Sequence, residues 1–147
     1  MIRAILDTNV IVSALIAKKP STLLTLYNAF KAQHFLLITS VAILEEVEEV
    51  INREKIIKLH KLSVKQRQAL IKELITLSFV VPGLLTLDKT IIERDPDDDK
   101  FIAAALEGNA QYIVSGDRDL LQLKVYQGVH ILSPKDFISA MPETPLR

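Results

Sequence analysis

Short apolar runs that alternate with helix-like segments are the feature of this sequence that most constrains its fold. Each run is four to six residues long and rich in branched aliphatic residues, which suits a strand buried on both faces. The runs span residues 2–6, 34–39, 78–82, 111–115 and 129–132. Strands that alternate with helices in this way predict a parallel sheet with helices on both of its faces.

Serine residues mark the expected beginnings of four helices, because a serine side chain can accept a hydrogen bond from the first helical turn. The predicted pairs of cap and helix are Ser21 with 22–32, Ser40 with 41–52, Ser63 with 64–77, and Ser133 with 134–140. A further helix is expected from about Asp97 to Glu107, with Gly108 as its C′ residue. No repeat or low-complexity linker divides the chain, so we expect one domain over 1–140 and a loose tail at 141–147.

Composition excludes several classes of protein. The 147 residues suffice for a single core, and the absence of cysteine excludes disulfides, thiol nucleophiles and thiolate metal sites. The formal net charge is zero, so no global basic field indicates a nucleic-acid partner. The N-terminus lacks a signal-peptide pattern, and no stretch approaches the roughly 20 apolar residues of a membrane span. A cytoplasmic location is compatible with these features.

Acidic residues gather where the predicted strands end. Asp7 directly follows the first strand, and Asp117 follows the fourth by two residues. The run "DPDDD" at 95–99 places four aspartates at the start of the helix that leads into the fourth strand. Two carboxylates about 4 Å apart repel by roughly 4 kcal/mol at an effective dielectric constant near 20, so water or a cation must offset that repulsion.

The position of these acids in the predicted sheet indicates a metal site. In open α/β sheets, ligands bind beyond the carboxyl ends of the strands, near a switch point in strand order. Mg²⁺ and Mn²⁺ take hard oxygen ligands of the kind that carboxylates supply. Each acid alone has a structural explanation, since Asp7 can cap a turn and residues 97–99 can complement a helix dipole. Together, at the strand ends, they favour a metal site.

The helix expected after the second strand carries four glutamates, which helical geometry divides into two groups. At about 100° per residue, its apolar stripe consists of Ile43, Leu44, Val47, Val50 and Ile51. Glu45 and Glu49 point away from this stripe and are expected to face solvent. Glu46 and Glu48 lie on its two borders, where a side chain can reach a cleft, and the geometry does not choose between them.

Four segments of the chain resemble the PIN-domain family, and the closest branch is that of bacterial toxins from toxin–antitoxin pairs (VapC-like ribonucleases). The segments are "AILDTNVIVSAL", "SVAILEEV", "DPDDDKFIAAALEGNAQYIVSGDRDLL" and "ILSPKDFI". The resemblance covers nearly the whole chain. It implies a three-layer α/β/α sandwich around a five-stranded parallel sheet in the order 3-2-1-4-5, which makes the strands before Asp7 and Asp117 neighbours.

The resemblance also implies a set of site residues. The family's second acidic position lies six residues after the helix-opening serine, which selects Glu46 over Glu48. The implied catalytic and metal-binding quartet is Asp7, Glu46, Asp99 and Asp117, with Asp119 as an auxiliary ligand and Asn9 and Ser115 as supporting polar residues. Asp98 adjoins Asp99, and whether it shares that role stays open. The implied reaction is hydrolysis of RNA phosphodiester bonds, assisted by one or two Mg²⁺ or Mn²⁺ ions.

The aspartates of "DPDDD" thus divide into three expected roles. Pro96 disfavours a helical conformation at Asp95, which is expected to be a solvated loop residue. Asp97 or Asp98 is placed to cap the following helix. Asp99 lies in the first turn, on a face that can reach the cleft, and is expected to bind the metal ion.

RNA and protein partners are also expected. Residues 53–67 hold a local excess of basic charge, and Arg53, Lys55, Lys58 and Lys61 are candidates for binding RNA phosphates; a solvated helical face is the alternative. The resemblance implies a cognate antitoxin, is compatible with a homodimer, and implies no membrane. It requires no histidine nucleophile, and the three histidines, His34, His60 and His130, are expected on the surface or in loops.

Two other functions compete with the ribonuclease. A metal-dependent phosphohydrolase of the haloacid-dehalogenase type also begins with a strand and an aspartate, but it needs a second aspartate where this chain has Asn9. A non-catalytic interaction module of the PIN fold is the other alternative. Degenerate members of that kind lose acids from the quartet, whereas this chain keeps all four.

Overall fold

A mainly parallel sheet lies at the centre of the computed structural model, which describes residues 1–88, 90–93 and 95–142. Its strand order is β3-β2-β1-β4-β6-β5. The strands are β1 Arg3–Leu6, β2 Leu36–Ser40, β3 Phe79–Val81, β4 Tyr112–Val114, β5 Val125–Tyr126 and β6 Val129–Leu132. In β1, Ile5 pairs with Ile38 on one side and with Ile113 on the other. The predicted α/β sandwich is confirmed, and β6 takes the place of the predicted fifth parallel strand.

The edge strand β5 is an addition that the sequence analysis does not predict. It pairs antiparallel with β6, with Tyr126 opposite Val129. Gln127 and Gly128 form the two-residue connection, and both have positive φ, 47° and 82°, as a type I′ hairpin turn requires. The order 3-2-1-4-5 therefore describes the five parallel strands, and a short hairpin extends the sheet beyond the last of them.

The helices begin where the serines predict. They are α1 Thr8–Ile16, α2 Thr22–Lys31, α3 Val41–Ile51, α4 Glu54–His60, α5 Val64–Leu77, the 3-10 turn η1 Pro96–Asp98, α6 Asp99–Glu107, α7 Arg118–Leu123 and α8 Pro134–Ala140. The four predicted caps are confirmed, because the hydroxyls of Ser21, Ser40, Ser63 and Ser133 each accept a hydrogen bond from the backbone N–H three residues further on. Local sequence therefore sets most of the helix boundaries.

Helix α1 is not predicted, because its sequence is apolar almost all round. Val10, Ile11, Val12 and Leu15 are all buried, and the helix packs against both α2 and α3. A helix that buries most of its faces shows no clear polar stripe, so its 3.6-residue period cannot be read from the sequence.

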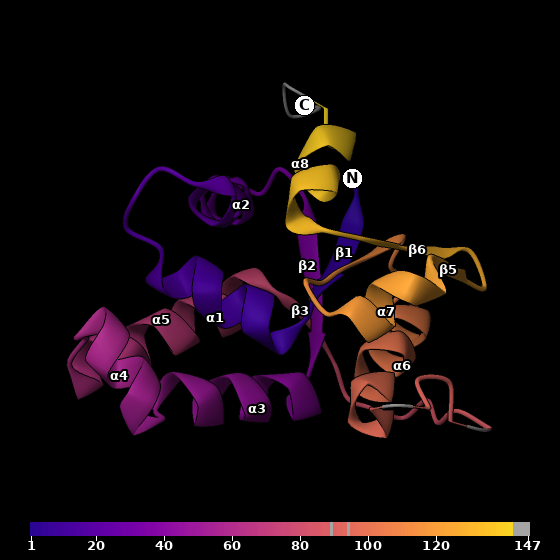
Figure 1. Cartoon of the computed structure of the whole chain (residues 1–147), viewed down its shortest axis with the longest axis horizontal. Coiled ribbons are helices and arrows are strands. Elements are labelled where there is room, and N and C mark those ends of the chain that lie inside the picture. The colour runs from indigo at the N-terminus through magenta and orange to yellow at the C-terminus, as the bar shows by residue number, and fades with distance from the viewer. Residues whose placement is uncertain (89, 94, 143–147) are drawn as a thin grey trace.

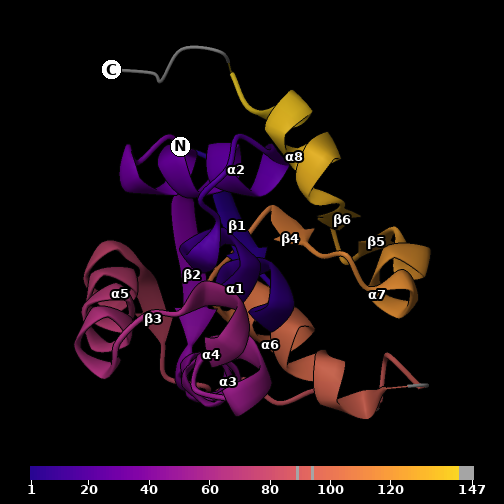
Figure 2. The same cartoon turned by 60° about the vertical axis from the view of Figure 1, so that its left-hand side comes forward.

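Helices cover both faces of the sheet and one of its ends (Figures 1 and 2). In Figure 1, α1, α3, α4 and α5 lie on one side of the sheet, and α6 and α7 lie on the other. Figure 2 shows α2 and α8, which are in contact, at the end of the sheet where β1 begins. There, Phe35 and Phe137 pack edge to face with ring centroids 5.1 Å apart. The carboxyl ends of β1 and β4 thus lie at the opposite end. No helix in the described parts of the chain is long and apolar enough to span a membrane.

Gly108 follows α6, but not in the left-handed conformation that a C′ glycine adopts. Its φ is −90°, and the left-handed conformation falls instead to Asn109, with φ 52°. Glycine is needed at 108 for packing, because a Cβ atom there would lie 2.4 Å from Cγ2 of Ile38 in β2. The backbone of α6 thus approaches the sheet more closely than any other residue type would allow.

A polar network around two buried side chains, His60 and Arg67, also includes Asn52 and Leu62, and we call it the α3–α5 corner. The Arg67 guanidinium donates to Oδ1 of Asn52 (2.7 Å) and to the Leu62 carbonyl (2.5 Å). Nδ1 of His60 accepts from the Leu62 N–H (2.9 Å), so Nε2 carries the proton and donates to the Ile51 carbonyl (3.2 Å). The expectation that His60 lies on the surface or in a loop is wrong, because its side chain is 2% exposed.

Candidate metal centre

Asp7 begins helix α1 at the carboxyl end of β1. Its backbone is extended, and its carboxylate accepts a hydrogen bond from the Val10 N–H (2.8 Å). The other carboxylate oxygen accepts from the hydroxyl of Ser115, which follows β4. Asp7 is 5% exposed. A helix cap at a strand end therefore holds this carboxylate in a buried position.

Ser115 connects Asp7 with Asp117. Its hydroxyl donates to Asp7 and accepts from the backbone N–H of Asp117 (2.9 Å). Asp117 in turn begins α7, and its carboxylate accepts from the Asp119 N–H (2.8 Å). Because β1 and β4 are adjacent in the sheet, one fully buried serine orients both strand-end acids.

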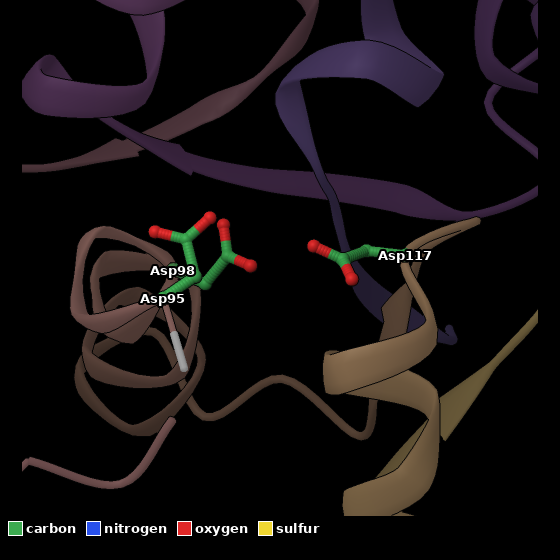
Figure 3. Close-up of side chains that lie close together, drawn as sticks. All are labelled: Asp95, Asp98 and Asp117. Atoms are coloured by element: carbon green, nitrogen blue, oxygen red, sulfur yellow. The ribbon is translucent and has the colours of Figure 1, made fainter. Parts of the chain in front are cut away.

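Asp95 and Asp98 face Asp117 from the start of α6. The three side chains each offer a carboxylate oxygen, and these oxygens all lie within 4.8 Å of one another (Figure 3). One oxygen of Asp98, Oδ2, is buried and has no hydrogen-bond partner within the described part of the chain. We call Asp7, Asp95, Asp98 and Asp117 the acidic centre.

The electrostatics of the acidic centre show that its carboxylates lack compensating charge. Burial raises the pKa of Asp98 to about 8, and a hydrogen bond to Asp117 and the charges of Asp95, Asp117 and Asp7 act in the same direction. Burial also raises the pKa of Asp7; the hydrogen bonds from Ser115 and Val10 oppose this effect. Both pKa shifts reflect negative charge that no described cation offsets within the acidic centre.

The acidic centre fits a hard divalent cation. It combines several carboxylate oxygens with a buried oxygen that no donor in the described ranges satisfies, and an ion would supply positive charge there. Asp95, Asp98 and Asp117 are the residues that could bind the ion directly. Asp7 is not among these direct ligands, because both of its carboxylate oxygens already accept hydrogen bonds.

Glu46 lies beside this centre, but other groups already occupy its carboxylate. One oxygen accepts a hydrogen bond from the Thr8 hydroxyl, and the other lies 2.5 Å from the Lys100 ammonium. Lys100 also contacts Asp97 at 2.9 Å. Burial alone lowers the pKa of Lys100, but the hydrogen bonds and charges of Glu46 and Asp97 outweigh it, and the net pKa is raised. The stripe analysis is consistent with this placement, since Glu46 is half-buried and Glu48 exposed.

Asp99 does not point into the acidic centre. Its two carboxylate oxygens accept hydrogen bonds from the backbone N–H groups of Ile91 (2.9 Å) and Ile92 (2.7 Å). We expected the Asp99 carboxylate to lie near Asp7 and Asp117, but the Asp98 carboxylate lies there instead. In the structure Asp99 anchors the preceding loop, and its role as a metal ligand stays a prediction.

A 3-10 turn explains this one-residue difference in register. Residues 96–98 form η1, and the Asp98 N–H donates to the Asp95 carbonyl at 2.9 Å. Side chains three residues apart eclipse in a 3-10 turn, so Asp95 and Asp98 lie on one face. Asp95 is exposed as expected, yet it faces the centre. Asp98 is the N-cap residue of α6, as predicted, but among the described residues its side chain makes no capping hydrogen bond.

The remaining predicted residues lie outside the acidic centre. Asn9 is exposed on α1 and makes no side-chain hydrogen bond to the described residues. Asp119 lines a neighbouring cavity of about 290 Å³, together with Ile91, Ile92 and Gln122. Sequence reasoning missed the roles of Asp95, Thr8 and Lys100. The role of Asp95 could have been predicted from its spacing of three residues from Asp98.

The basic segment 53–67 lies far from the acidic centre, since α4 and α7 are at opposite sides of the molecule in Figure 1. Arg53 pairs with Glu49 at 2.9 Å, and Lys58 pairs with Glu54 at 3.6 Å. Lys55 and Lys61 are exposed. Arg67 is buried in the α3–α5 corner, so it adds nothing to a basic surface.

Comparison with known proteins identifies the family. A PIN-domain family model matches residues 3–119. The chain belongs to the PIN-domain family. PIN domains are nuclease domains, and here the acidic centre lies at the carboxyl ends of adjacent strands, where a PIN-domain site is expected.

One solved structure shows the same fold. It is VapBC2 from Rickettsia felis bound to a DNA fragment from its promoter, with a TM-score of 0.53 and 16% sequence identity, over 88% of this chain and 97% of that chain. At that identity, the likeness concerns the fold of the PIN domain alone. No curated protein matches the sequence.

Proposed function

We propose that this PIN domain is a metal-dependent ribonuclease whose divalent cation, Mg²⁺ or Mn²⁺, is bound by Asp95, Asp98 and Asp117. The observation that carries the proposal is the buried Oδ2 of Asp98, an acceptor that no described donor satisfies, within a group of converging carboxylates. The reaction is hydrolysis of RNA phosphodiester bonds. We further propose that residues 1–140 act as one domain; the tail at 141–147 falls mostly outside the described residues.

Each residue of the site has a distinct part in this proposal. The bound ion would supply Lewis acidity to the scissile phosphate and lower the pKa of a water nucleophile. Asp98 and Asp117 hold the ion between the start of α6 and the end of β4, and Asp95 completes the set from η1. The negative charge of Asp7 adds to the attraction of the site for a cation. Ser115 orients both the Asp7 carboxylate and the backbone of Asp117.

Glu46 and Asp99, which the resemblance includes in the quartet, act differently in this proposal. Glu46 lies at the rim of the acidic centre and is held by Thr8 and Lys100. Asp99 fixes the backbone of Ile91 and Ile92, and through that loop it restrains the segment that carries Asp95. Of the four candidate RNA-binding residues, Lys55 and Lys61 are exposed and form no ion pair with the described residues, and we propose that they meet RNA phosphates.

We also propose that the protein is the toxin of a toxin–antitoxin pair and that its partner is a cognate antitoxin. The support is the sequence resemblance to bacterial PIN-domain toxins and the shared fold with the Rickettsia felis VapBC2 structure. Co-expression with the product of the neighbouring gene, followed by affinity purification, tests the pairing. Recovery of a stable complex that suppresses cleavage supports it, and two independently purified proteins without mutual inhibition refute it.

The catalytic proposal is tested by incubating the purified chain with RNA and with p-nitrophenyl phosphate, each with and without Mn²⁺. A ribonuclease cleaves only RNA, and only with the metal. Release of p-nitrophenol without RNA cleavage would instead indicate a small-molecule phosphohydrolase. Inactivity on both substrates, with intact metal binding, would favour a non-catalytic interaction module. The Asp98→Asn variant is the control for contaminating nucleases.

A further inference from the structure

Lys100 is a mostly buried cation beside the acidic centre, and neither the nuclease fold nor the acidic quartet accounts for it. It is the second residue of α6, and its side chain is 17% exposed. Its ammonium lies 2.5 Å from Oε2 of Glu46 and 2.9 Å from Oδ2 of Asp97. A lysine side chain loses considerable rotamer freedom on burial, so a well-defined position of this kind requires strong partners.

The contacts of Glu46 place the Lys100 ammonium at the rim of the acidic centre. The second oxygen of Glu46 accepts from the hydroxyl of Thr8, which is adjacent to Asp7 in sequence. Lys100 itself follows Asp98 by two residues on the same chain segment. Glu46 and Lys100 therefore bridge α3, the start of α1 and the start of α6, the last two of which also carry members of the acidic centre.

The Lys100 ammonium already contacts the Glu46 oxygen that a second divalent ion could use as a ligand. In two-metal nuclease sites the ions lie about 3.5–4 Å apart, so a second ion would need oxygen ligands next to the acidic centre. Glu46 is an acid beside the centre that could serve a second ion, and its two oxygens face Thr8 and Lys100. An ion at Oε2 would have to displace the ammonium, and the like charges of the two cations would oppose their coexistence.

We propose that Lys100 takes the place of a second metal ion, so that the chain binds one divalent cation and uses the Lys100 ammonium as the second positive charge that faces the scissile phosphate. Lysine binds phosphate as a compact point charge, which suits this role. The proposal rests on the proposed nuclease function, since it assigns a charge within that site. Glu46 is then a positioning residue that holds the ammonium, and not a metal ligand.

Counting bound Mn²⁺ ions tests this proposal directly. Isothermal titration and electron paramagnetic resonance should give one Mn²⁺ per chain for the wild type. The Lys100→Met variant, which frees Glu46, should bind two, and the Lys100→Met/Glu46→Gln double variant should return to one. Lys58→Met, which removes an exposed lysine that also pairs with a glutamate, is the matched control and should bind one.

Cleavage kinetics give the second readout. At a Mn²⁺ concentration that fills only the first site, Lys100→Met should lower kcat roughly 100-fold, the range for removing one preorganised group that stabilises transition-state charge. Lys100→Arg, which keeps the charge, should recover part of that loss. Lys100→Gln serves in place of Lys100→Met if thermal melting shows that the methionine variant is unfolded.

The outcomes separate this inference from the proposed function. Two Mn²⁺ ions on a wild-type chain that cleaves RNA would overturn the inference and leave the function intact. One ion on the wild type and two on Lys100→Met, without RNA cleavage by the wild type, would support the substitution of an ion by Lys100 and refute the ribonuclease. A Lys100→Met variant with one ion and undiminished kcat would reduce Lys100 to a structural ion pair and overturn the inference.

Discussion

The α3–α5 corner and the acidic centre are both partly or fully buried polar clusters, but only the corner is internally satisfied. In the corner, the Arg67 guanidinium donates to two oxygens, and both ring nitrogens of His60 have partners. In the acidic centre, carboxylates face one another, and Oδ2 of Asp98 has no donor within the described part of the chain. The corner matches donors to acceptors, whereas the acidic centre leaves one buried acceptor without a donor among the described residues.

This difference separates a structural cluster from a functional one. Satisfied buried polar groups fix the way in which helices meet, and breaking them destabilises the fold. Facing carboxylates destabilise the metal-free protein, and that unfavourable energy becomes affinity for a cation. Substitutions in the corner should therefore change stability without changing chemistry, and substitutions in the acidic centre should do the reverse.

The largest expected effect is on catalysis, in the acidic centre. Asp98→Asn should lower Mn²⁺-dependent RNA cleavage about 1,000-fold, because the loss of a charged ligand removes several kcal/mol of metal-assisted stabilisation. Metal-free Asp98→Asn should melt no lower than the wild type, since one source of repulsion is gone. Single-turnover cleavage and thermal melting measure the two effects. Unfolding of this variant, or full activity, would place Asp98 with the structural residues.

The α3–α5 corner should give the opposite result. Arg67→Met should lower the free energy of unfolding by about 3 kcal/mol, because two charge-assisted hydrogen bonds from a buried guanidinium disappear. Cleavage per folded molecule should be unchanged. Urea denaturation measures the stability, and Lys65→Met, an exposed site on the same helix, is the control, expected within about 0.5 kcal/mol. A similarly small effect of Arg67→Met would contradict the structural role of the corner.

Metal-free stability should depend on pH through the acidic centre. The folded pKa of Asp98 is raised from 3.8 to about 8, so its contribution is fully present below pH 3.8 and is lost as pH rises through 8. The raised pKa of Asp7 acts in the same direction. With EDTA present, the wild-type melting temperature should fall relative to that of Asp98→Asn between pH 5 and pH 9. Parallel pH profiles of the two proteins would show that Asp98 is ionised throughout.

The smallest expected effect lies outside both clusters. Replacing Lys55 and Lys61 together with alanine should weaken RNA binding and reduce the slope of log K against log salt by at most about two. A fluorescence-anisotropy titration at several salt concentrations measures this slope. Replacement of Lys19 and Lys135, two exposed lysines elsewhere, is the control. Equal slopes for both double variants would make the basic segment an ordinary solvated face.

Local sequence predicted the parts of the fold that depend on neighbouring residues. The serine caps at 21, 40, 63 and 133 use a hydroxyl and an amide three residues apart, so the sequence alone determines them. The border position of Glu46 followed from helical periodicity. Helix α1 was missed because burial on most of its faces removes the polar stripe on which such predictions depend.

Features that depend on tertiary contacts could not be predicted from local sequence patterns. Asp98 and Asp99 are adjacent and chemically identical, and only the 3-10 turn at residues 96–98 decides which of them faces Asp117. The burial of His60 and Arg67 depends on where α3, α4 and α5 meet, which local patterns do not encode. The pairing of Lys100 with Glu46 likewise joins residues 54 positions apart.

The most direct test compares Mn²⁺ binding by the wild type, Asp98→Asn and Asp99→Asn in isothermal titrations at one pH. If the cation is held by Asp95, Asp98 and Asp117, Asp98→Asn should bind Mn²⁺ more than about 100-fold more weakly, beyond the 10–100-fold typical of residues that only support a ligand. Asp99→Asn should bind it nearly as tightly as the wild type. Loss of binding in Asp99→Asn, with normal binding in Asp98→Asn, would contradict the acidic centre described by the structure.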